Sequence, residues 1–170
     1  MMSIVMALLA MVSIPAQPSC DDPDADIWVK DMHERVESFD LLARYATERF
    51  GPPQTCFGSV TSEFDGMKFG FLRLGYRGGA TFEVETVPPE GSMVTLRAAS
   101  GLGDIAFARE VLEDYAFNIG LEVDWDTPSE TTEGGERIQS FHDSDSGLNA
   151  TASLIFREDL LVAVRLSMAL

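Results

Sequence analysis

Cysteine and histidine are the side chains that most often bind transition metals or serve as nucleophile and base, and this chain has two of each. They are Cys20, His33, Cys56 and His142. A structural zinc site takes four such ligands and a catalytic site usually three. Because the four residues are far apart in the sequence, they predict no zinc site. Neither histidine has a sequence neighbour that would make it a catalytic base.

The 28 Asp and Glu residues offer carboxylates for acid–base chemistry or for calcium. Acid–base catalysis needs two of them to converge in a cleft, which residue order does not show. Calcium takes six to eight oxygens from a suitably folded loop, and the DSDSG segment at 143–147 is better explained as a hairpin turn. We therefore expect no metal and no cofactor. The two acidic clusters that could supply oxygens to calcium are Asp124, Asp126 and Glu130, and Asp143, Asp145 and Asn149.

Sequence motifs for a catalytic nucleophile or for nucleotide binding are absent: there is no GxSxG, no Walker A and no GxGxxG after a strand. Gly101-Leu102-Gly103 precedes an expected helix, where backbone amides can hold an anion. A helix cap at Ser100 or Asp104 explains this segment better.

Five of the eleven phenylalanines lie between residues 55 and 98. Glu83 and Glu85 alternate with apolar residues, so we expect them to point outward and to pair with arginines such as Arg73 or Arg97. The phenylalanines of this region are expected in a core under a helix, and an aromatic groove for a ligand is the alternative. These phenylalanines are Phe57, Phe64, Phe69, Phe71 and Phe82.

The net charge of −16 narrows the choice of partners. A strongly acidic surface repels nucleic acid and anionic membranes. The acids are dispersed rather than gathered in a tail, which is typical of a solvated acidic surface. We expect no nucleic acid partner and no membrane span. The length of 170 residues suits a single domain.

Residues 1–16 have the features of a cleaved signal peptide. The uncharged apolar run Ile4–Val12 is too short to cross a bilayer, which takes about 20 residues, but suits a signal core. Cleavage after Ala16 leaves 17–25 as a polar linker and predicts a periplasmic or secreted protein. The alternatives are an N-terminal element packed on the domain and lipidation at Cys20.

Two cysteines in an exported chain predict a disulfide between Cys20 and Cys56. Closing that loop would stabilise the fold by about 4 kcal/mol. A helix expected over 26–49 lies between them and is about 36 Å long, so the flanking segments 20–25 and 50–56 must run back along it. The bridge is feasible but tight, and a buried free thiol at Cys56 is the alternative.

The first half of the chain predicts one helix followed by four strands. Apolar residues at spacings of three and four indicate the helix over 26–49, and Gly51-Pro52-Pro53 ends it. Short turns, among them Asp65-Gly66 and Arg77-Gly78-Gly79, separate the strands and indicate an antiparallel meander. The expected strands are 55–64, 67–76, 80–87 and 92–98.

The second half predicts a helix over 101–119 and then further strands. Alternation indicates a strand at 121–125, and the polar composition of 127–136 indicates a loop. The helix is expected to bury Ile105, Ala108, Leu112, Tyr115 and Ile119. The remaining strands are expected at 137–142, 148–156 and 160–168.

This order predicts an α+β domain over 26–170: helix, four strands, helix, about four strands, with the helices packed on one face of an antiparallel sheet. The two halves share their order of elements, but their residues do not align as a repeat.

The signal-like start and the missing catalytic constellation together favour an exported, non-catalytic binding or interaction module. Its partner would be a protein or peptide that uses the outer face of the sheet or an edge strand. One alternative is a hydrolase using Asp or Glu in a pocket between helix and sheet. Another is a domain with an apolar cavity for small ligands.

Overall fold

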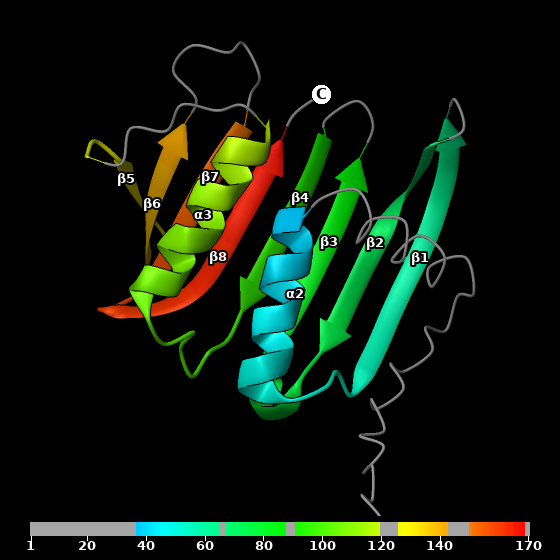
Figure 1. Cartoon of the computed structure of the whole chain (residues 1–170), viewed down its shortest axis with the longest axis horizontal. Coiled ribbons are helices and arrows are strands. Elements are labelled where there is room, and N and C mark those ends of the chain that lie inside the picture. Colours follow the sequence, from blue (N-terminus) through cyan, green and yellow to red (C-terminus); the bar gives the residue numbers. More distant parts are fainter. Residues whose placement is uncertain (1–36, 65–66, 88–90, 120–125, 143–149, 169–170) are drawn as a thin grey trace, which may run out of the picture.

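The computed structural model describes residues 37–64, 67–87, 91–119, 126–142 and 150–168. These residues form an α+β fold in the order helix, four strands, helix, four strands, which confirms the predicted class (Figure 1). The expected signal peptide and linker, together with Cys20 and His33, lie outside the described residues.

The helices are α2 (Glu37–Phe50) and α3 (Ile105–Ile119), and a short 3-10 turn, η1 (Arg77–Gly79), joins the second and third strands. The strands are β1 (Thr55–Phe64), β2 (Met67–Gly75), β3 (Thr81–Val87), β4 (Gly91–Arg97), β5 (Ser129–Glu133), β6 (Glu136–His142), β7 (Ala150–Arg157) and β8 (Leu160–Met168). The strand order β1-β2-β3-β4-β8-β7-β6-β5 makes one antiparallel sheet.

The sheet has an approximate two-fold arrangement of its elements. The last strands of the two halves, β4 and β8, pair with each other at the centre, and the first strands, β1 and β5, end the strand order. The two helices lie on the same face of the sheet and run in opposite directions, as a rotation about the β4–β8 pair requires (Figure 1). The two halves therefore repeat the arrangement of their helices and strands, although their residues do not align.

The layer between the helices and the sheet is filled by apolar side chains. The helices also contact each other, since the Tyr45 ring stacks on Phe107 with 3.5 Å between ring centroids. The Tyr45 hydroxyl donates a hydrogen bond to the carbonyl of Leu102. The largest fully buried side chains of this layer are Leu42, Leu72, Phe82, Leu96, Leu102, Leu112, Leu154 and Leu166.

Helix α3 starts at a side-chain cap. The carboxylate of Asp104 accepts a 2.8 Å hydrogen bond from the backbone N–H of Ala106, which decides between the two expected cap residues. Gly103 just before it has φ +90°, and a Cβ there would lie 2.6 Å from the Arg49 guanidinium. A glycine is therefore needed where the chain passes α2 on its way into α3.

The expected buried face of α3 is correct for Ala108 and Leu112 and wrong for Ile105, while the side chains of Tyr115 and Ile119 lie outside the described part of the structure. Ile105 is 44% exposed, whereas Val111, which we did not place on that face, is buried with Ala108 and Leu112. At 100° per residue, including Val111 moves the centre of the buried stripe away from Ile105. Ile105 then lies at the margin of the stripe and in the first turn.

The predicted loop over 127–136 is also wrong. It contains β5, the turn Gly134-Gly135 and the first residue of β6. Both glycines have positive φ, +57° and +81°, as a two-residue hairpin turn requires. Every residue of β5 is exposed, so no alternation of apolar residues could reveal the strand. The strand expected at 121–125 and helical residues 26–36 lie outside the described residues.

Candidate binding face

The face of the sheet opposite α2 and α3 carries no helix in the described part of the chain, and we call it the open face (Figure 1). One row of directly paired residues crosses all eight strands on it, and we call this the central row. From β1 to β5 the row is Phe57, Arg73, Glu83, Thr95, Arg165, Ser153, Ser140 and Ser129. It is aromatic and charged at one end and made of serines at the other.

An aromatic patch of Phe57, Phe71 and Arg73 lies on the open face beside the β1 edge. The two rings are tilted with centroids 6.2 Å apart, and the Arg73 guanidinium lies 5.3 Å from the Phe71 ring. Phe57 is 55% exposed. Large apolar side chains left in contact with water beside a strand edge are typical of a contact surface.

The expectation that the phenylalanines pack in the core is correct for Phe82, which is 1% exposed, and wrong for Phe57. Strand alternation explains the difference, because Phe57 pairs with Arg73 on the open face whereas Phe82 pairs with Leu74 on the helix side. The side chains of Phe64 and Phe69 lie outside the described part of the structure.

The expected outward pairing of Glu83 is confirmed. Its carboxylate accepts a 2.6 Å hydrogen bond from Nε of Arg73 in the adjacent strand. The side chains of Arg73 and Glu83 are 52% and 31% exposed, so this ion pair is worth at most about 1 kcal/mol. It fixes the orientation of Arg73 over Phe71 more than it stabilises the fold.

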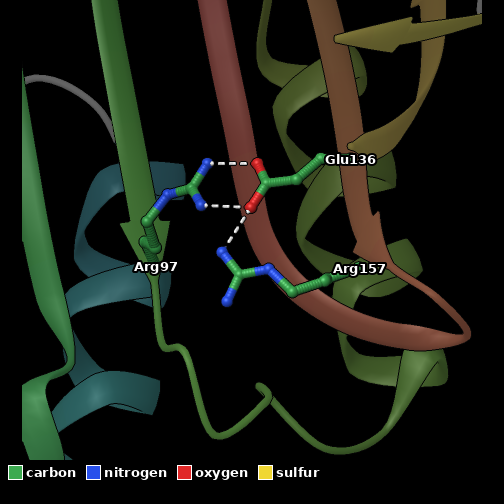
Figure 2. A network of polar contacts seen from close by, with 3 residues as sticks. All are labelled: Arg97, Glu136 and Arg157. Atoms are coloured by element: carbon green, nitrogen blue, oxygen red, sulfur yellow. Dashed lines mark hydrogen bonds and ion pairs between the residues drawn. The ribbon is translucent and has the colours of Figure 1, made fainter. Parts of the chain in front are cut away.

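A second charged cluster on the open face joins the two halves of the chain. The carboxylate of Glu136 accepts hydrogen bonds from both terminal nitrogens of Arg97, at 2.9 and 3.0 Å, and from Nη2 of Arg157 at 2.8 Å (Figure 2). Arg97 ends β4, Glu136 begins β6 and Arg157 ends β7. Because β8 lies between β4 and β7 in the sheet, the cluster connects β4 to β6 and β7 across β8.

The two guanidinium groups change the ionisation of Glu136. Hydrogen bonds from Arg97 lower its pKa from 4.5 to about 2, with Arg157 adding to the effect against the desolvation of a carboxylate that is 16% exposed. The same bond to Glu136 raises the pKa of Arg97. Glu136 is therefore ionised across the physiological range and serves as a structural anion.

The sequence analysis did not predict the cluster of Arg97, Glu136 and Arg157. Glu136 fell in the predicted loop, and Arg157 fell between the strands expected at 148–156 and 160–168. The available signal was the opposite charge of two residues that pair directly across β6 and β7. Arg97, which enters from the other half of the chain, could be added only from the strand order.

His142 ends β6 on the open face, as expected for a strand-end residue. Its Nε2 lies 3.0 Å from Oγ of Ser129 and its Nδ1 lies 3.1 Å from Oγ1 of Thr151. The Ser129 hydroxyl also donates to the carbonyl of Ser140 at 3.2 Å, so its single proton is already used. Nε2 of His142 then donates to Ser129, which is the reverse of the arrangement that activates a serine nucleophile.

The two edge strands differ in length and composition. β1 has ten residues and an irregularity in its pairing between Val60 and Ser62. β5 has five residues, SETTE, all exposed. Charge and shortness protect an edge from pairing with other chains, and β5 has both features. Within the described ranges no strand pairs with the outer side of β1.

Cys56 is buried in β1 on the helix side of the sheet. Its expected disulfide partner, Cys20, lies outside the described residues, so the Cys20–Cys56 disulfide stays a prediction.

Of the acidic clusters, Glu130 accepts a 2.7 Å hydrogen bond from Gln139 and a 3.3 Å bond from Arg137. The other members of these clusters, Asp124, Asp143, Asp145 and Asn149, are outside the described residues. In the part of the chain that the structure describes, no three side chains of the metal-binding types gather at one point.

Comparison of the chain with protein-family models, with curated proteins and with solved structures finds no match. None of the helices in the described ranges has the length and apolar character needed to cross a membrane.

Proposed function

We propose that the chain is an exported, non-catalytic module that binds a protein or peptide partner at the β1 edge. The observation that carries the proposal is the exposed aromatic patch beside the longer of the two edge strands. In strand addition, the edge backbone supplies hydrogen bonds and neighbouring side chains supply selectivity. Phe57 and Phe71 are suited to the second role, since aromatic residues anchor many interfaces.

The charge of the chain supports a partner with basic residues. The net charge is −16, and Glu83 and Glu85 lie beside the aromatic patch on the open face. An extended peptide with alternating apolar and basic residues matches this surface, because its apolar side chains meet Phe57 and Phe71 while its cations meet the acids.

The test is selection of short random peptides displayed on phage against the whole chain, followed by titration of the synthetic winners. Phe57→Ser should weaken binding by about tenfold, because an aromatic anchor is worth about 1–2 kcal/mol. Phe117→Ser is the matched control, since Phe117 is 84% exposed on α3, away from the patch. Equal losses in the two variants, or a selection that enriches no peptide, would contradict the proposal.

The export part of the proposal rests on the signal-like residues 1–16. Intact mass without reductant, on protein recovered from its native host, tests it. We expect a chain that begins at Gln17 and carries a Cys20–Cys56 disulfide. An uncleaved chain with two free thiols would remove export while leaving the binding edge to be tested by the peptide titration.

A further inference from the structure

Arg165 lies at the centre of the open face with no partner for its guanidinium among the described residues. It is in β8, directly paired with Thr95 of β4 on one side and Ser153 of β7 on the other. Its Nε is buried from solvent and makes no hydrogen bond. A buried donor without an acceptor costs about 1–3 kcal/mol, so native structures rarely keep one without a reason.

The other arginines that the structure describes on this face each hold a carboxylate. Arg73 holds Glu83, and Arg97 and Arg157 share Glu136. Arg97 uses both terminal nitrogens on the two carboxylate oxygens, at 2.9 and 3.0 Å. Arg165 has the same planar fork of donors and lacks the anion.

Two hydroxyl groups flank Arg165 and can add donors. Thr95 and Ser153, 7% and 5% exposed, are the buried polar residues of the described chain. Thr95 makes no side-chain hydrogen bond within the described ranges, so its proton is available. Oγ of Ser153 lies 3.0 Å from Oγ of Ser140, and since one proton serves that contact, the pair has another to offer.

We propose that Arg165, Thr95 and Ser153 form a binding site for a carboxylate group at the centre of the open face. The guanidinium would hold the two carboxylate oxygens, and the hydroxyls would donate to the lone pairs that remain. The nearest acid in the central row, Glu83, is paired with Arg73 and lies on the far side of Thr95 from Arg165. No described acid of the row therefore competes directly for the guanidinium.

Charge favours a carboxylate over a phosphate. The chain has a net charge of −16, and Glu83 and Glu136 lie on the same face. One guanidinium balances one negative charge, so the second charge of a phosphate dianion would meet mainly the repulsion of the surrounding acids. The ligand class is therefore a singly charged carboxylate, from a small acid or from an acidic side chain of a partner.

The site is separate from the proposed peptide-binding edge. β8 is four strand spacings from β1 in the sheet order, or about 19 Å at the usual distance between strands. The inference does not rest on the proposed function, and either can fail without the other.

The experiment uses nitrogen-15-labelled full-length chain and follows the Arg165 Nε–H resonance by NMR, with sodium acetate as the probe and sodium chloride at equal ionic strength as the reference. We expect a saturable shift with acetate, with a dissociation constant in the millimolar range. Arg73 Nε–H is the internal control, since Glu83 already occupies it. A shift that follows acetate and chloride equally, without saturation, would overturn the site.

Variants then test the role of each group. Thr95→Val should weaken acetate binding by about tenfold, because it removes one hydroxyl donor to a charged ligand. Thr131→Val on β5 is the matched control and should leave binding unchanged. In Arg165→Lys, the backbone resonances of Thr95 and Ser153 should lose their saturable response. Unchanged affinity in Thr95→Val, or saturation by inorganic phosphate but not by acetate, would contradict the assignment.

Discussion

The two halves of this molecule share one arrangement of elements and differ in what they present at their outer edges. The first half ends the strand order with β1, which is ten residues long and carries the exposed ring of Phe57. The second ends it with β5, five exposed polar residues. The difference matches the proposed function, in which β1 takes a partner strand and the short, charged β5 does not.

At the centre of the sheet the two halves are joined by strand pairing and by a shared apolar layer. β4 and β8 pair antiparallel, and the apolar layer under both helices includes side chains from each half. On the open face, Arg97 of the first half and Glu136 of the second complete the connection. The comparison therefore predicts one cooperative structure whose two edges behave differently.

The largest effect is expected in the core. Phe82→Ala in the first half and Leu154→Ala in the second should each lower the free energy of unfolding by about 3–5 kcal/mol, because both side chains are fully buried. Urea unfolding followed by circular dichroism measures this. Both variants should show a single transition shifted to lower urea. Two separate transitions would contradict the prediction of one cooperative structure, since the halves would then unfold independently.

The next effect concerns the cluster that bridges the halves. Glu136→Gln should lower the free energy of unfolding by at most about 3 kcal/mol at neutral pH, because the charge held by two guanidinium groups is lost. The folded-state pKa is lowered from 4.5 to about 2. The stabilisation is therefore present above pH 4.5 and is lost as pH falls through about 2.

The measurement for Glu136→Gln is urea unfolding at several pH values. The difference between wild type and variant should narrow across the acid range. Glu133→Gln on exposed β5 is the matched control and should change stability by less than about 0.5 kcal/mol. A difference that does not depend on pH would mean that the cluster does not act through its charge.

These effects rest on features that the sequence revealed to different degrees. Helical periodicity predicted α3, and the short turns between strands, with alternation in 80–87, predicted the strands of the first half. β5 could not be predicted in the same way, since all its residues are exposed. Phe57 was misplaced because an aromatic residue in a strand resembles core until its face is known.

The groups on the open face were harder still to predict. Glu83 could be placed on it from alternation within its own strand. The neighbours of Glu136 and Arg165 could be identified only from the strand order β4-β8-β7-β6, which brings together residues far apart in the chain. Such pairing depends on topology, and local propensity contains no information about it.

A smaller loss of stability is expected from removing the cap of α3, the helix that begins the second half. Asp104→Ala should lower the free energy of unfolding by about 1 kcal/mol, because it removes the hydrogen bond to the Ala106 N–H at the start of α3. Ser100→Ala is the control, since Ser100 is exposed and was the other expected cap. Chemical denaturation of both variants measures the difference. If Ser100→Ala lowered the free energy of unfolding more than Asp104→Ala does, Ser100 and not Asp104 would be the cap of α3.

The smallest effect is expected at the exposed ion pair of the first half. Arg73→Gln should change the free energy of unfolding by less than about 1 kcal/mol, because its side chain is 52% exposed. Comparison with Arg97→Gln, in the more buried bridging cluster, sharpens the contrast between the two charged groups. Thermal unfolding at low and high salt measures both. A larger loss in Arg73→Gln than in Arg97→Gln would reverse the ranking.

We propose that β1 is the binding edge of the sheet and that β5 is not. Hydrogen–deuterium exchange of the whole chain, with and without a phage-selected peptide, tests it most directly. We expect slower exchange in β1 on binding, with β5 unchanged, because an added strand supplies acceptors to the β1 edge amides. Protection of β5, or of the helices, with β1 unchanged would contradict it.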